Sequence, residues 1–174
     1  MGALAVDDLA GYDELVGGFL PGTHRPPAMT VRVERTIEVP APVDRVWDFI
    51  ADPGKRAGAI SVVEDFEVHD NGRATWHVRL PIPVVSRTIA VETSERSRDP
   101  PHSVSFEGRS RVFHVLGEHE FEAIDGGTRL TNRFVVDGKL PGVERFFESR
   151  LDGELANLEA ALRADLGVEE DGSP

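Results

Sequence analysis

Apolar residues recur at steps of four and three through the last part of the chain. They are Val143, Phe147, Leu151, Leu155, Leu158, Leu162 and Leu166. This spacing places them on one face of a helix of about seven turns. Charged residues fill most of the other positions, so the predicted helix is amphipathic and needs an apolar surface to lie on.

The segment before this helix shows the two-residue alternation that is typical of half-buried strands. The alternating runs are 31–39, 60–70, 73–83, 84–96, 102–109, 111–124 and 128–138. Asn71-Gly72 stands between two of them and is a strong hairpin signal. After the first run, Pro42 suits a first helical turn, and Asp52-Pro53 ends the short helix that it opens.

These elements predict an α+β fold. We expect a curved antiparallel sheet of about seven strands wrapped around the long C-terminal helix, with one or two short helices after the first strand. A helix that lies across a curved sheet leaves a hollow between the two, and we expect the functional site there.

We divide the chain into an N-terminal extension (1–28), one domain (29–166) and an acidic tail (167–174). In the extension, Leu9, Tyr12, Val16 and Phe19 could line one helical face before the prolines of 21–27 break the helix. Two interpretations stay open: a loose segment ahead of the domain, or a docking helix for a partner or for the mouth of the hollow.

Charge narrows the choice of partners. The chain has 174 residues, no cysteine and a net charge of −12, and only Lys55 and Lys139 among its 19 basic residues are lysines. An acidic chain repels nucleic acid, so we expect no nucleic-acid partner. Arginine use with acidic excess suggests adaptation to high salt, although GC-rich coding favours arginine as well. We see neither a membrane-spanning run nor a signal peptide, and we expect a cytoplasmic protein.

Four local features give the chain a family resemblance. They are the opening strand that leads into APVDRVWDFIADP, the hairpin strands after it, the strand GGTRLTNRF and the long closing helix. In this order they resemble the START-like superfamily of polyketide cyclase-like or helix-grip proteins over residues 29–166. The nearest groups are the polyketide cyclase/dehydrase proteins and a group of carbon monoxide dehydrogenase accessory proteins. Members of the second group carry an Ile-Pro-Gly-Cys-like segment and a C-terminal extension. Here Asp52-Pro53 leads instead to residues 59–62, and the extension is absent.

Strand alternation indicates which side chains face the hollow. Together with one helix residue, the candidate ligand-binding residues are Trp76, Arg87, Phe106, Arg111, Phe113, His119, Asn132, Phe134 and Phe147. This wall is apolar and aromatic with four polar interruptions, which suits a flat hydrophobic ligand that carries one or two oxygen atoms. Each interruption also has a structural interpretation: the arginines could be rim residues paired with Glu64, Asp65 or Glu107, and His119 and Asn132 could be satisfied core residues.

No catalytic motif stands out, and we expect neither a cofactor nor a metal ion. His114 and His119 are an odd number of residues apart, so they face opposite sides of a strand and cannot share a metal. Our first hypothesis is the binding or carriage of a small hydrophobic molecule such as a lipid, a quinone or a polyketide-like aromatic. The second is a cyclase or dehydratase, in which neutral His119 would donate to a ligand carbonyl or act as a general base. The third is an accessory or assembly subunit of a molybdenum hydroxylase-like complex. Formation of a homodimer or of a complex with a partner protein stays open.

Overall fold

The computed structural model describes residues 30–168, so the predictions for the N-terminal extension and for most of the acidic tail lie outside it. All the strands of the described chain form one antiparallel sheet in the order β1-β7-β6-β5-β4-β3-β2. The strands are β1 (Thr30–Val39), β2 (Val63–Val68), β3 (Arg73–Val78), β4 (Ile89–Asp99), β5 (Ser103–Arg109), β6 (Phe113–Ile124) and β7 (Gly127–Gly138). The helices are α2 (Val43–Ile50), α3 (Pro53–Ala59) and α4 (Val143–Leu166).

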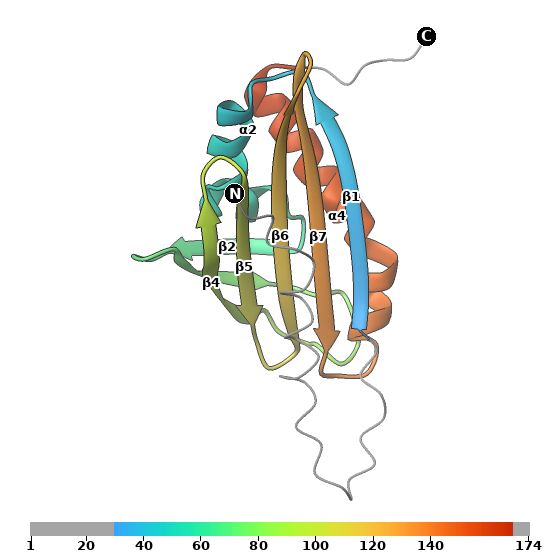
Figure 1. Ribbon diagram of the computed structural model, residues 1–174. Coiled ribbons are helices and arrows are strands. Elements are labelled where there is room, and N and C mark those ends of the chain that lie inside the picture. Colours follow the sequence, from blue (N-terminus) through green and yellow to red (C-terminus); the bar gives the residue numbers. More distant parts are fainter. Residues whose placement is uncertain (1–29, 169–174) are drawn as a thin grey trace, which may run out of the picture.

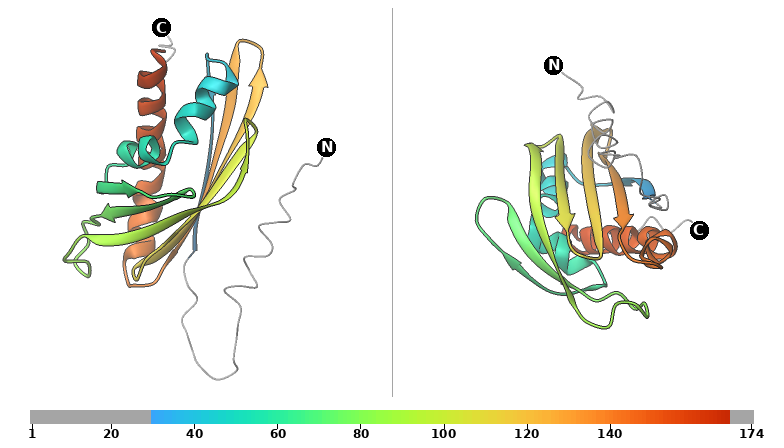
Figure 2. Two further views of the ribbon diagram at one scale, coloured as in Figure 1. Left: turned by 90° about the vertical axis from the view of Figure 1, so that its left-hand side faces the viewer. Right: turned by 90° about the horizontal axis from the view of Figure 1, so that it is seen from below.

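The sheet curves around α4, as the α+β prediction requires. In Figure 1, α4 runs behind β6, β7 and β1, and Figure 2 shows β2, β3 and β4 sweeping across towards the helix. Helices α2 and α3 lie over the same concave face (Figure 2). All seven residues of the predicted apolar stripe on α4 are buried. The helix-grip architecture is therefore confirmed.

Local sequence signals explain how the chain turns. Asn71 and Gly72 both have a positive φ, of 63° and 68°, and they join β2 to β3 in the predicted hairpin. At the start of α3 the side chain of Asp52 accepts a hydrogen bond from the Lys55 amide at 2.9 Å, and Pro53 occupies the first turn. The Asp-Pro pair therefore ends α2 and also begins a second short helix.

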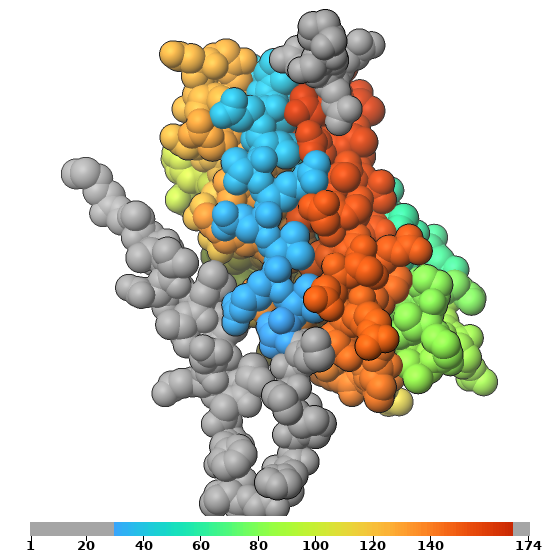
Figure 3. All heavy atoms as spheres, turned by 90° about the vertical axis from the view of Figure 1, so that its right-hand side faces the viewer, coloured from blue at the N-terminus to red at the C-terminus, as the bar shows by residue number. Residues whose placement is uncertain are grey.

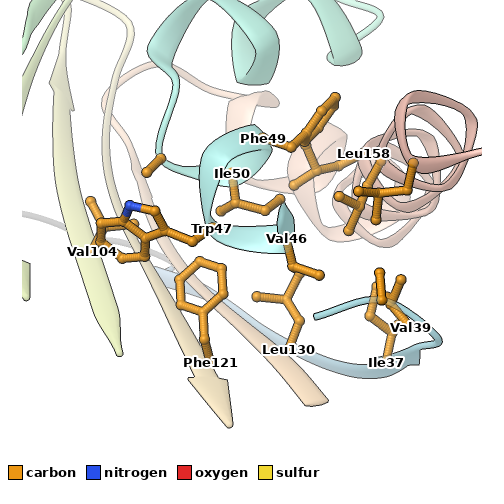
Figure 4. Close-up of a cluster of buried hydrophobic side chains, with 14 residues drawn as sticks. Ile37, Val39, Val46, Trp47, Phe49, Ile50, Val104, Phe121, Leu130 and Leu158 are labelled. Atoms are coloured by element: carbon orange, nitrogen blue, oxygen red, sulfur yellow. The ribbon is translucent and has the colours of Figure 1, made fainter. Parts of the chain in front are cut away.

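One end of the space between sheet and helix is filled completely. There, α2 inserts Trp47 against Phe121 of β6, with ring centroids 5.2 Å apart, and Figure 4 shows Val46 and Ile50 beside them. Leu158 of α4 belongs to the same cluster. This cluster holds α2 between the sheet and the C-terminal half of α4, so no hollow remains at that end.

A partly buried ion network fastens α4 to the edge strand. Glu159 is 9% exposed and accepts hydrogen bonds from Arg35 of β1 at 3.1 Å and from Arg163 at 3.0 Å. Arg163 also donates to the carbonyl oxygen of Glu38. Figure 3 shows β1 and α4 side by side on this face. The network fixes the position of the helix along the strand.

Three predicted boundaries were wrong. The fourth strand begins at Ile89, so Arg87 lies in the loop 79–88, where Pro81 and Pro83 cannot donate to a strand ladder. Arg111 lies in the turn before β6. The last helix begins at Val143 and not at Pro141, because Gly142 adopts a left-handed conformation with φ 89° in front of it.

Two glycine positions give a test of packing at the centre of the sheet. A Cβ atom on Gly117 would lie 3.0 Å from a ring carbon of Phe134 and closer still to Phe106, so Gly117→Ala forces aromatic rings apart. We expect it to lower the free energy of unfolding by about 1–3 kcal/mol. Chemical denaturation measures this change.

The matched control is Gly153→Ala on the exposed side of α4, where a Cβ atom meets nothing within 4 Å. It should raise the free energy of unfolding by about 0.5–1 kcal/mol, because alanine favours the helix. Equal effects of the two substitutions would contradict this description of the sheet.

Candidate functional site

A cavity lies between the concave face of the sheet and the N-terminal half of α4. Its volume, measured as the space open to the centres of water molecules, is about 80 Å³. Its aromatic lining consists of Trp76, Phe106, Phe113, Phe134, Phe146 and Phe147. A water molecule needs roughly 10–15 Å³ on this measure, so the cavity has room for about six waters. One or two fused rings fit this space without a change in the fold.

The structure brings most of the predicted site residues together at this cavity. Those that line it are Trp76, Phe106, Phe113, His119, Phe134 and Phe147. Asn132 is buried behind His119 and contacts it directly. Alternation along β3, β5, β6 and β7 therefore identified the inner face of the sheet.

Arg87 and Arg111 do not belong to the cavity. Both side chains are exposed, and neither residue lies in a strand. The carboxylates suggested as their partners have other contacts: Glu64 binds Arg79 at 2.7 Å, and Glu107 binds Arg109 and His114. The two polar anchors that the sequence placed in the wall are thus surface residues.

His119 presents a hydrogen-bond acceptor at the cavity. Its side chain is fully buried, stacks on Phe106 at a centroid distance of 5.8 Å and meets Phe134 edge-on. Nδ1 lies 2.7 Å from Oδ1 of Asn132, so Nδ1 carries the proton and donates to the amide oxygen. Nε2 has no partner and keeps its lone pair. In this tautomer His119 cannot donate to a ligand carbonyl, which revises one of the roles considered for it.

The protonation state of His119 follows from its surroundings. Burial away from water lowers the pKa of the imidazole to about 3, and the positive charge of Arg56 lowers it further, against the opposing effect of the hydrogen bond to Asn132. His119 is therefore neutral at physiological pH. His114, on the opposite face of the same strand, binds Glu107 at 2.7 Å, so the predicted separation of the two histidines is confirmed.

Arg56 is a cavity residue that sequence reasoning missed. It lies on α3, is only 6% exposed, and places its guanidinium over the ring of Phe106 at 4.9 Å from the centroid. Nη1 donates to the carbonyl oxygen of Ile50 at 3.0 Å, and Nε has no partner. Desolvation lowers the pKa of Arg56 to about 10, so the side chain remains charged at neutral pH. The helix around it is built of glycine and alanine, and this composition leaves no apolar stripe to show which face is buried.

Unpartnered polar atoms concentrate at this cavity. Among the buried side-chain atoms of residues 30–168, the nitrogen and oxygen atoms without a hydrogen bond are Nε of Arg56, Nε1 of Trp76, Nε2 of His119 and Oδ1 of Asp137. All of these except the oxygen of Asp137 belong to residues that line the cavity. Buried polar atoms normally find a partner, and leaving one without costs about 1–3 kcal/mol. The cavity thus offers two N–H donors and one acceptor in an otherwise apolar space.

The loop between α3 and β2 closes one side of the cavity against α4. Ile60 and Val62 from this loop and Glu154 from α4 belong to the lining. Between them, the amide of Ser61 donates to Glu154 Oε2 at 2.7 Å, and the Ser61 hydroxyl hydrogen-bonds the other carboxylate oxygen. These bonds hold the loop to the helix.

A curved antiparallel sheet closed over an apolar cavity by a C-terminal helix defines a helix-grip protein of the START-like superfamily. Residues 30–163 match the family model described as polyketide cyclase/dehydrase and lipid transport, and the chain belongs to this family. The family is the first of the two groups that the sequence resembles. No protein with a curated function matches the sequence.

Solved structures share the fold at low sequence identity. The Zhui aromatase/cyclase from Streptomyces sp. R1128 is 19% identical, with a TM-score of 0.65 over 84% of this chain and 100% of that one. A START superfamily protein from Mycobacterium smegmatis is 13% identical, with a TM-score of 0.63 over 78% of this chain and 97% of its own. A conserved protein from Geobacillus kaustophilus is 16% identical, with a TM-score of 0.66 over 79% and 95% of the two chains. At these identities the likeness shows the fold alone.

The described residues contain neither a membrane-spanning helix nor a cluster of metal ligands. Among residues 30–168, no helix is both long and apolar enough to cross a membrane. The same part of the chain contains no group of three or more histidine, aspartate or glutamate side chains placed to hold a metal ion.

The buried neutral imidazole makes a prediction about stability. Since the pKa of His119 is about 3 when folded and about 6.5 when unfolded, the unfolded chain binds the extra proton first as the pH falls. Stability contributed by this group is complete above pH 6.5 and is lost below it, at about 1.4 kcal/mol per pH unit. We expect a loss of about 2 kcal/mol between pH 7.5 and pH 5 in urea denaturation.

His119→Gln should remove most of this pH dependence, whatever its effect on absolute stability. His114→Gln is the control, because that ring lies on the outer face beside Glu107. A pH dependence in the His119 variant as steep as that of the unaltered protein would show that the imidazole is not held neutral.

Proposed function

We propose that this protein binds and carries a small hydrophobic ligand in the cavity between the sheet and α4. The observation that carries the proposal is the set of unpartnered polar atoms on Arg56, Trp76 and His119, which line an aromatic cavity. A core built only for stability would fill this space or pair these atoms. A ligand with oxygen atoms among its rings satisfies both requirements at once.

The energetics are consistent with reversible binding. Burying about 200 Å² of apolar ligand surface contributes on the order of 5 kcal/mol at about 25 cal/mol per Å². Association costs offset much of that gain, so the polar contacts must supply the rest of a micromolar affinity. Of the three ligand types considered, an aromatic polyketide fragment or a quinone of one or two rings fits the volume of about 80 Å³. A longer lipid would need the α3–β2 loop to move away from α4.

Catalysis as a cyclase or dehydratase is the second candidate function. The family description and the position of His119 at the cavity favour it. The pKa of about 3 argues against it, because a general base works best when its pKa is near the operating pH. We therefore place carriage first. An accessory role would depend on outer surfaces or on the N-terminal extension, and it stays a prediction, as do high-salt adaptation, cytoplasmic location and oligomeric state.

Ligand binding can be followed at a single atom. The chain has two tryptophans, and only Trp76 lines the cavity, so its indole N–H signal in a ¹H–¹⁵N spectrum reports occupancy, with Trp47 as an internal reference. We expect naphthalene or 2-naphthoate to shift the Trp76 signal. Val115→Phe, which fills the cavity from β6, should lower the affinity by about tenfold or more.

Leu116→Phe adds the same ring to the opposite face of the same strand and should leave binding unchanged. Native mass spectrometry of protein purified from its own source, followed by denaturing extraction, would then identify the natural ligand. If neither compound shifted Trp76 and the purified protein were empty, the binding proposal would fail.

A separate measurement distinguishes carriage from catalysis. A general base at His119 would accelerate exchange of the central protons of a 1,3-diketone such as acetylacetone in deuterated water. Because the imidazole is a weak base, we expect wild type and His119→Gln to give the same exchange rate by NMR. A rate that falls by roughly 10²-fold or more in the variant would favour the enzyme.

A further inference from the structure

Arg56 is a buried charge without a counter-ion. Among the residues that the structure describes, no carboxylate oxygen lies within ion-pair distance of its guanidinium, which contacts a ring and a backbone carbonyl instead. Buried charges are normally paired, because an isolated ion loses its hydration without compensation. The missing partner is therefore an anion that the chain itself does not supply.

The nearby carboxylates are occupied elsewhere. Asp52 caps α3 through the Lys55 amide, and Glu95 pairs with Arg98 at 2.8 Å. Glu154, on the far side of the cavity, holds Ser61. Each of these groups has a structural contact to lose if it turned towards Arg56.

The other polar atoms of the cavity define the rest of the ligand. Trp76 adds a second N–H donor, and Nε2 of His119 accepts, because Nδ1 donates to Asn132. Two donors suit an oxygen that carries negative charge, and one acceptor suits a hydroxyl or acid proton on the same molecule. His119 is neutral, so Arg56 alone supplies positive charge from the sheet side of the site.

We propose that the cavity selects aromatic ligands that bear an anionic oxygen, namely a carboxylate, phenolate or enolate, and that Arg56 binds this oxygen. This inference rests on the proposed function and names the ligand class for the same site. A neutral hydrocarbon would fill the cavity but leave the guanidinium unpaired. A ligand cation would meet a like charge in a poorly hydrated space, where repulsion is strong.

Three probes of one shape test the selection. Naphthalene, 2-naphthoate and 2-(aminomethyl)naphthalene share a ring system and differ in charge at neutral pH. We expect 2-naphthoate to bind at least tenfold more tightly than naphthalene, and the ammonium compound to bind more weakly than either. The Trp76 indole signal measures each affinity, and the comparison needs no variant.

Substitution then assigns the preference to one residue. Arg56→Met keeps the length of the side chain without the charge, and it should abolish the tenfold preference for 2-naphthoate while naphthalene still binds. Arg56→Lys should retain part of the preference. Arg98→Met is the matched control, because Arg98 also stacks on an aromatic ring, that of Trp47 at 5.2 Å, but lies outside the cavity lining.

The outcomes separate the two proposals. Equal affinities for naphthalene and 2-naphthoate in the unaltered protein would overturn anion selection and leave hydrophobic binding in place. Absence of binding by all three probes would overturn the binding proposal itself. Retention of the preference in a folded Arg56→Met protein would show that another group binds the anion.

Discussion

Contact between α4 and a curved sheet is the constraint on which the rest of the structure depends. The helix has to bury one apolar stripe along its whole length, but the sheet curves, so the distance between them is bridged by different side chains at each end. At the C-terminal half, α2 enters the space with Trp47 and Ile50 and closes it. At the N-terminal half, aromatic rings from the sheet reach towards Phe147 without filling the space, and the cavity is what remains.

The centre of the sheet is arranged around this space. Gly117 has no side chain, and this lets the rings of Phe106 and Phe134 approach β6 and meet each other at a centroid distance of 5.9 Å. His119 lies two residues further along the same strand and packs against both rings. The same aromatic pair thus supports the core, orients the imidazole and gives the guanidinium of Arg56 a face to stack on.

How much of the site the sequence predicts depends on the kind of element that carries each residue. Alternation is strict on long strands, so Phe113, His119 and Phe134 could be placed correctly before the fold was known. It fails at Arg87, because the alternating pattern continues through a proline-containing loop that leaves the sheet. It cannot reach Arg56, because a seven-residue helix of small residues has no periodic stripe. The charged anchor of the cavity therefore becomes visible only in three dimensions.

The coupling between Arg56 and His119 bears on the choice between carrier and enzyme. In the empty cavity, two effects lower the pKa of His119, and desolvation is larger than the charge of Arg56. A bound anion would neutralise Arg56 and relieve the smaller effect, while the ligand that brings it would exclude water and strengthen the larger one. The imidazole therefore remains neutral in both states. It keeps its role as a hydrogen-bond acceptor and does not become a base of useful strength. A site that holds its histidine in one protonation state through loading and release is suited to carrying a ligand unchanged.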